Sequence, residues 1–151
     1  DIIRYADVLL WKAEALIELG RQNEALPLIN EVRARAANST SRLKLANGDF
    51  PSNYRMNQYQ PGVNITWDEA TARTALQWER RLEFAMESPR FFDLVRWGIA
   101  AETLNAYIAK EKTRHSFLDN AQFIKNRNEY FPIPQREVDF TKGLYKQNPG
   151  F

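Results

Sequence analysis

The fold of this chain is decided by its opening stretch, IIRYADVLLWKAEALIELG, which occupies residues 2–20. Apolar residues recur there at every third or fourth position, and one row consists of Ile2, Ala6, Leu9, Ala13 and Leu16. This spacing is typical of an α-helix that buries a wide apolar face. Gly20 is expected to end the helix, because glycine readily adopts the left-handed conformation found after helix C-termini.

A second helix is predicted directly after Gly20. Its apolar stripe consists of Ala25, Ile29, Val32 and Ala36. Pro27 is expected near the first turn, where its missing N–H costs little. Two helices joined by a short turn form an antiparallel hairpin, so residues 1–37 are predicted to be a tetratricopeptide-like helical hairpin.

Residues 38–66 show no sustained period and are rich in Asn, Gly and Pro, which predicts a long irregular loop. Loops of this length inside a compact domain are usually functional, or they wrap a neighbouring part of the protein. The next helix is expected to begin at a capping box formed by Thr66 and Glu69, and to end near Met86.

Two further helices complete a predicted helical block over residues 67–112. Ser88 and Pro89 are suited to the N-cap and first position of one helix, which Gly98 would end. The other helix is expected over residues 100–112. The closing segment, residues 113–151, is predicted to be extended around the prolines of Tyr130 to Pro134. The predicted fold class is therefore mainly α, with long irregular loops and no extensive sheet.

Composition excludes several classes of function. The 151 residues include 21 basic and 19 acidic side chains, a net charge of +2, and these are well mixed, so no nucleic-acid partner is expected. The chain has no cysteine, which excludes disulfides and thiolate metal sites. The only histidine, His115, has no metal-ligand pattern around it. We therefore expect no metal and no cofactor.

The densest polar stretch runs from residue 79 to residue 97. Glu79, Glu83 and Glu87 would form one row on a helix, and such a row repels itself unless cations stand between its members. The expected structural ion network consists of these three carboxylates with Arg80, Arg81, Arg90, Asp93 and Arg96, and it would tie one helix to the next across the Ser88–Pro89 corner.

The alternative role for this row is an acid and base pair of a glycoside hydrolase. Carboxylates closely matched by arginine are expected to have lowered pKa values, which would be wrong for a general acid. A structural role is therefore favoured, and no catalytic residue is predicted.

Aromatic side chains in Asn-rich surroundings are the remaining functional signal. Sugar rings stack their C–H faces on aromatic side chains, while their hydroxyls need amide or hydroxyl partners. Tyr54, Asn57, Tyr59 and Trp67 are the candidate ligand-binding residues on this ground. The same composition would arise if aromatic residues simply pinned an irregular loop to the body of the protein.

Four blocks of sequence, in order, resemble the SusD/RagB family. They are Arg4 to Gly20, Ala25 to Ala36, Glu79 to Gly98, and Phe131 to Phe151 with its Phe-Pro-Ile-Pro and Gln-Asn-Pro-Gly-Phe motifs. The resemblance implies the C-terminal part of a longer bacterial lipoprotein on the cell-surface side of the outer membrane. A lipid anchor outside this segment would attach it to the membrane.

The same resemblance implies a function. Family members bind oligosaccharides, or in some cases peptides, without cleaving them, and deliver them to a SusC-like TonB-dependent transporter. A tetratricopeptide-type adaptor remains the alternative, although such a protein would be expected to repeat its hairpin. Because an isolated loop must be ordered on binding, we expect this segment by itself to bind glycans weakly or not at all.

Overall fold

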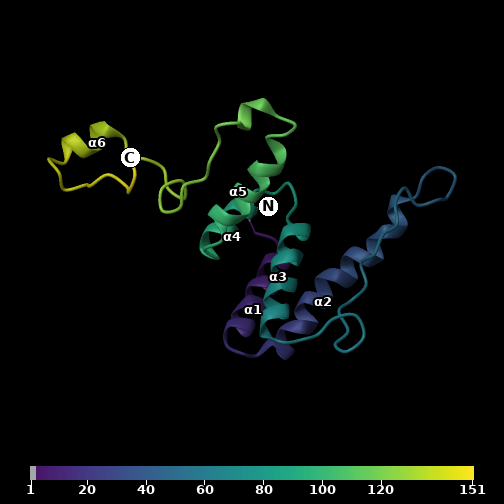
Figure 1. Cartoon of the computed structure of the whole chain (residues 1–151). Helices are drawn as coiled ribbons and strands as arrows, with labels where there is room; N and C mark the ends of the chain where they lie inside the picture. Colours follow the sequence, from purple (N-terminus) through teal and green to yellow (C-terminus); the bar gives the residue numbers. More distant parts are fainter. Residues whose placement is uncertain (1–2) are drawn as a thin grey trace. The chain divides into compact units, whose positions relative to one another are not determined.

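The structure, a computed structural model, describes residues 3–151, apart from the side chain of Ser41 (Figure 1). Within this described part the regular structure is helical and contains no strand, which confirms the mainly α fold class. Its elements are α1 (Tyr5–Glu18), α2 (Gln22–Ser39), α3 (Glu69–Glu83), α4 (Pro89–Arg96), α5 (Ala100–Glu111) and α6 (Gln135–Phe140), with the 3-10 helices η1 (Thr40–Leu43) and η2 (Ser116–Leu118). None of the described helices has the length and apolar character needed to cross a membrane.

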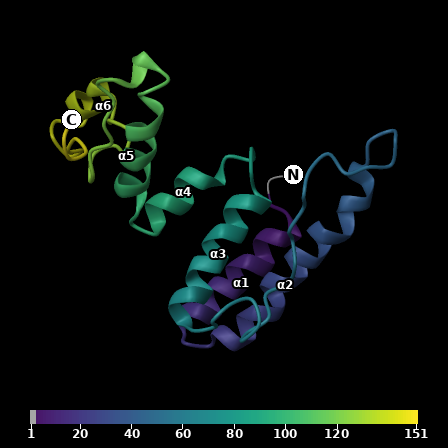
Figure 2. The ribbon, with the colours of Figure 1, turned by 45° about the vertical axis from the view of Figure 1, so that its right-hand side comes forward.

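The chain divides into two compact units, one ending at Glu87 and the other spanning Ser88–Phe151. In the first unit, α1 and α2 form the expected hairpin, and α3 packs against both of them (Figure 2). Leu10, Ile17, Ile29 and Leu76 are among the fully buried side chains that join the three helices. Gly20 closes the turn with a φ of 71°, a conformation that glycine adopts without steric cost.

Two expectations about helix starts in this unit were wrong. Helix α2 begins at Gln22, so Pro27 lies inside the helix rather than in its first turn. Helix α3 is capped by Asp68 and not by Thr66, because Asp68 forms the reciprocal capping box with Thr71. The Asp68 carboxylate accepts the Thr71 N–H at 2.8 Å, and the Thr71 hydroxyl accepts the Asp68 N–H at 3.0 Å. Asp is a strong N-cap residue, and Glu69 is used elsewhere, in an ion pair with Arg73.

The end of α3 also differs from the expectation. The helix stops at Glu83 rather than near Met86, and Phe84 is its C-cap. Met86 and Ser88 both have positive φ values, 69° and 71°, so the backbone leaves the helical path directly after the cap.

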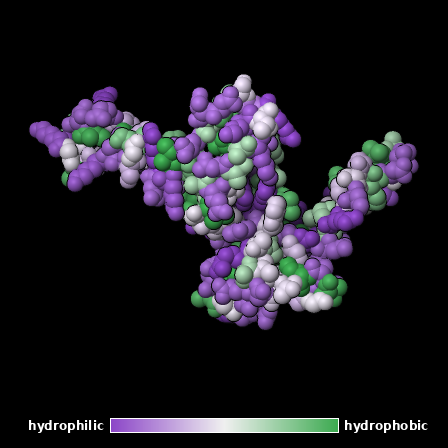
Figure 3. Space-filling model, in the orientation of Figure 1, coloured by the Kyte–Doolittle hydropathy of each residue, from purple (hydrophilic) through white to green (hydrophobic). Residues whose placement is uncertain are grey.

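The second unit begins with α4, whose first residue is Pro89, as the sequence predicts. Helix α5 also matches its expected range. The closing segment is not extended throughout, because the short helix α6 follows Pro134 directly. Few large side chains of this unit are buried, and Phe117, Phe131 and Phe140 are largely exposed. Figure 3 shows hydrophobic residues of the chain, in green, among hydrophilic ones on the face in view.

Candidate functional site

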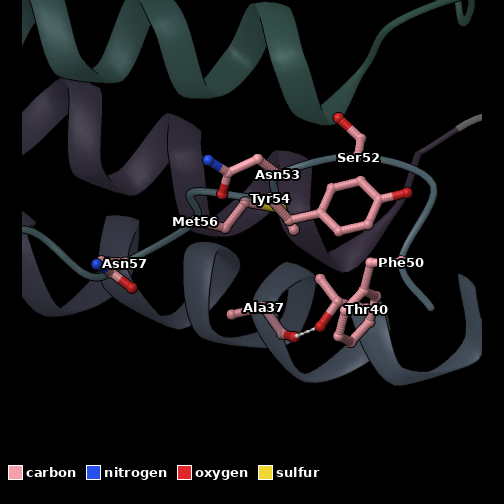
Figure 4. A pocket seen from close by; sticks show the side chains of 8 residues that line it. All are labelled: Ala37, Thr40, Phe50, Ser52, Asn53, Tyr54, Met56 and Asn57. Atoms are coloured by element: carbon pink, nitrogen blue, oxygen red, sulfur yellow. Dashed lines mark hydrogen bonds between the residues drawn. The ribbon is translucent and has the colours of Figure 1, made fainter. Parts of the chain in front are cut away.

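A cavity of about 300 Å³ lies where the end of α2 meets the following loop (Figure 4). We call it the loop pocket. It is lined by Ala37, Thr40, Phe50, Ser52, Asn53, Tyr54, Met56 and Asn57. The volume is at the lower end of the range of roughly 300–1,000 Å³ that ligand pockets occupy.

Two aromatic rings form one corner of the loop pocket. The centroids of Phe50 and Tyr54 are 6.0 Å apart, and the rings are nearly perpendicular, at 89°. The Lys44 ammonium lies over the Phe50 ring, 5.4 Å from its centroid. Perpendicular rings offer the face of one ring and the edge of the other, so a flat apolar surface such as a sugar ring can pack against both.

The polar side chains around these rings keep their hydrogen-bonding capacity for other partners. The side chains of Ser52, Asn53, Tyr54 and Asn57 form no hydrogen bond with any residue that the structure describes. The Thr40 hydroxyl is the exception, because it donates to the Ala37 carbonyl at 2.8 Å (Figure 4). Hydroxyl and amide groups therefore surround an aromatic corner and face solvent.

Other asparagines of the same loop are used differently. The Asn47 amide donates to the Asp49 carboxylate at 2.8 Å. The Asn64 side chain accepts the Gln60 N–H at 2.7 Å and donates to the Gln58 carbonyl at 2.9 Å. These side chains stabilise turns. The amides of Asn47 and Asn64 therefore have a structural role, whereas those of Asn53 and Asn57 are available to bind a ligand.

Arg33 of α2 anchors the loop beside the pocket. Its Nε donates to the Asn57 carbonyl at 2.7 Å, and its guanidinium stacks 4.2 Å from the centroid of the Tyr59 ring. Asn30, one turn earlier, donates to the Tyr59 carbonyl at 2.9 Å and accepts the Tyr59 N–H at 2.7 Å. The loop is thus fixed to α2 at residues 57–59, at one side of the pocket.

The structure separates the four predicted ligand-binding residues into two pairs. Tyr54 and Asn57 line the loop pocket. Tyr59 and Trp67 instead pack against the three-helix core, with ring centroids 6.1 Å apart. The Trp67 indole N–H donates to the carbonyl of Gln22 at 3.0 Å. This pair matches the alternative reading of the sequence, in which aromatic residues pin the loop.

The predicted carboxylate row does find arginine partners, although Glu87 lies beyond the end of α3, and these partners come from α2 and from Arg4, the N-cap of α1. Glu79 pairs with Arg33, and Glu83 pairs with Arg35. Arg4, just before α1, donates to a Glu83 carboxylate oxygen at 2.7 Å and binds both oxygens of Glu87, at 2.8 and 2.9 Å. These pairs tie α3 to the α1–α2 hairpin.

The arginines that the sequence suggested as partners lie in other surroundings. Arg80 is buried, with its guanidinium 3.7 Å from the Asp7 carboxylate. Arg81 is exposed and stacks on Trp78, 5.0 Å from the ring centroid. Arg96 donates to Asp93 at 2.9 Å within α4, and Arg90 is half-buried in the same helix.

The pKa of Glu79 contradicts the sequence expectation. Burial raises the pKa of this carboxyl above its usual value, and the opposing effect of the Arg33 guanidinium is smaller. Burial also raises the pKa of Tyr59, whose hydroxyl donates to Glu79 at 3.2 Å. Raised pKa values suit general acids, but this carboxylate is 5% exposed and does not line the loop pocket.

A second cavity, of about 290 Å³, lies between the first half of α1 and the last half of α2. It differs from the loop pocket in that its lining includes both charged and aliphatic side chains. Its lining consists of Arg4, Tyr5, Ala6, Leu9, Glu31, Val32 and Arg35.

No group of three or more His, Asp or Glu side chains that could hold a metal ion occurs among residues 3–151, where the structure describes them.

Comparison with known proteins identifies the family. The profile of the SusD family matches residues 1–151. SusD-like protein P38 of Formosa agariphila is 38% identical over 104 residues, which are 68% of this chain and 18% of that protein. SusD-like protein P2 of the same organism is 28% identical over 150 residues, 99% of this chain and 25% of that protein.

A solved structure shows the same fold. The crystal structure of a SusD homolog from Bacteroides thetaiotaomicron matches with a TM-score of 0.74 and 34% sequence identity, over 99% of this chain and 26% of that one. The chain therefore belongs to the SusD family, as its sequence blocks indicate. It spans about a quarter or less of the length of these relatives.

Proposed function

We propose that this chain is a segment of a non-enzymatic protein that binds glycans at the bacterial cell surface and passes them to a SusC-like TonB-dependent transporter. Membership of the SusD family carries this proposal. The outer-membrane location, the lipid anchor outside this segment and the transporter partner belong to the same proposal.

The loop pocket is the proposed point of glycan contact within this segment. Its support is the combination of a perpendicular pair of aromatic rings with four polar side chains that form no hydrogen bond among the described residues. Aromatic faces and amide or hydroxyl groups are the chemistry that sugar recognition needs. The carboxylates of α3 are engaged by arginines, which supports binding without cleavage.

Titration of the ¹⁵N-labelled chain with neutral oligosaccharides, followed by two-dimensional NMR, tests the site. Because the cavity is small and open, we expect weak binding, with a Kd of about 1 mM, or about −4.1 kcal/mol. Shifts should concentrate on residues 50–57. Tyr54→Ala should abolish them, while Tyr107→Ala, at an exposed position on α5, should not.

Two results would count against this proposal. Release of reducing ends during the titration would show cleavage and contradict a non-enzymatic role. Shifts caused by short peptides but by no saccharide would assign the pocket to a peptide ligand instead.

A further inference from the structure

The loop pocket differs from the rest of its unit in the charge of its walls. None of its lining side chains carries a charge, and its polar atoms are hydroxyl and amide groups. The cavity between α1 and α2, which has almost the same volume, is lined by two arginines and a glutamate. Charged side chains are thus available in this unit, yet none is among the residues that line the loop pocket.

Two cations beside the loop pocket, Arg33 and Lys44, contact other groups, and a third, Arg55, is exposed between Tyr54 and Met56 but is not among the lining residues. Arg33 donates Nε to the Asn57 carbonyl, forms an ion pair with Glu79 and stacks on Tyr59. The Lys44 ammonium rests on the Phe50 ring. An anionic ligand placed among the pocket side chains would lose part of its hydration without gaining the charge-assisted hydrogen bonds that arginine gives to carboxylates and sulfates.

A neutral ligand meets no such penalty. Amide and hydroxyl groups both donate and accept, so Ser52, Asn53 and Asn57 can match the hydroxyls of an uncharged sugar in either direction. The volume of about 300 Å³ is at the lower end of the range for ligand pockets, so the pocket suits a short saccharide unit.

We propose that the loop pocket selects uncharged saccharide units and excludes uronate and sulfated ones. This inference rests on the proposed glycan-binding function, because it names the class of sugar that the same pocket receives. The selectivity arises from walls that offer hydrogen bonds without charge.

Matched ligands test the selectivity on the 151-residue chain. The methyl glycosides of galactose and galacturonic acid differ only at C6. Galactose 6-sulfate serves as a second anionic ligand. We expect shifts at residues 50–57 with the neutral glycoside, and at least tenfold weaker binding of both acidic ligands at low ionic strength. A tenfold ratio corresponds to about 1.4 kcal/mol.

Variants make the test independent of any single ligand. Asn53→Lys adds a cation to the pocket wall and should bring the acidic glycoside to or above the affinity of the neutral one. Asn53→Gln keeps the wall uncharged and should retain the neutral preference. Circular dichroism at 222 nm confirms that each variant remains helical.

The outcomes separate the inference from the proposed function. Equal or tighter binding of the acidic ligands to the unchanged chain overturns the selectivity while leaving saccharide binding in place. If Lys44→Gln then removes the acidic preference, the Lys44 ammonium is the recognition group instead. Absence of shifts with every saccharide at tens of millimolar overturns both the glycan contact proposed for the loop pocket and its selectivity.

Discussion

Replacing Arg4 by alanine should destabilise the first unit, because this side chain joins the start of α1 to the end of α3. Its guanidinium donates to a Glu83 carboxylate oxygen at 2.7 Å, to the Glu83 carbonyl at 3.1 Å, and to both oxygens of Glu87. The Glu83 side chain is 6% exposed, whereas that of Glu87 is 46% exposed.

The magnitude follows from these exposures. Hydrogen bonds to a buried charged group contribute about 1.5–3 kcal/mol, so the Glu83 contacts dominate. The exposed Glu87 pair adds no more than about 0.5 kcal/mol. Arg35 continues to neutralise Glu83 after the change, so the loss stays below the 3–5 kcal/mol that is typical of an unpaired buried charge. We expect a total of about 2–3 kcal/mol.

Urea denaturation followed by circular dichroism at 222 nm measures this loss, and Arg81→Ala is the matched control. Arg81 is exposed and stacks only on Trp78 among its described contacts, so its removal should cost less than about 1 kcal/mol. A double-mutant cycle of Arg4→Ala with Glu83→Gln should give a coupling energy above about 1 kcal/mol. Equal losses for the two arginines, or a coupling energy near zero, would refute the reasoning.

Three further changes probe the core, the turn and the buried carboxyl. Leu10→Ala, at a fully buried position, should reduce the unfolding free energy by about 2–5 kcal/mol in the same urea assay, and a loss below 1 kcal/mol would contradict the core assignment. Gly20→Ala should cost about 1–2 kcal/mol because φ is 71°, and Gly20→Asn should cost less, since asparagine tolerates that conformation better. The raised pKa of Glu79 means that its stabilising contribution is fully present below its ordinary pKa of 4.5 and is lost as the pH rises through the raised value. The unfolding free energy of the protein relative to Glu79→Gln should therefore fall as the pH rises above 4.5, and a rise instead would oppose the assignment.

Local sequence patterns were sufficient for most of the fold. The hairpin, α4 and α5 follow from the spacing of apolar residues. Gly20 and Pro89 mark a helix end and a helix start through local backbone conformation. The predicted start of α3 was wrong because two possible capping boxes overlap there, and the helix is capped by Asp68 rather than by Thr66. A choice between overlapping caps depends on the path of the incoming loop, which a local pattern does not contain.

The ion network and the pocket depend on contacts between distant residues. Arg33 and Glu79 are 46 positions apart, and Arg4 and Glu83 are 79 apart, so no helical spacing rule relates them. Loop composition did point to Tyr54 and Asn57. It could not separate them from Tyr59, because the anchoring of Tyr59 by Asn30 and Arg33 appears only once the loop lies against α2.

The anchoring of the loop at residues 57–59 affects how the sequence of such a protein can diverge during evolution. Residues 44–56 lie outside that anchor, and the pocket side chains Ser52, Asn53 and Tyr54 form no hydrogen bond with any other described residue. Doubling the length of a flexible loop costs only about 0.6 kcal/mol in closure entropy. Insertions and replacements in this stretch therefore leave the α1–α3 core almost unaffected, so ligand preference can diversify while the scaffold stays the same.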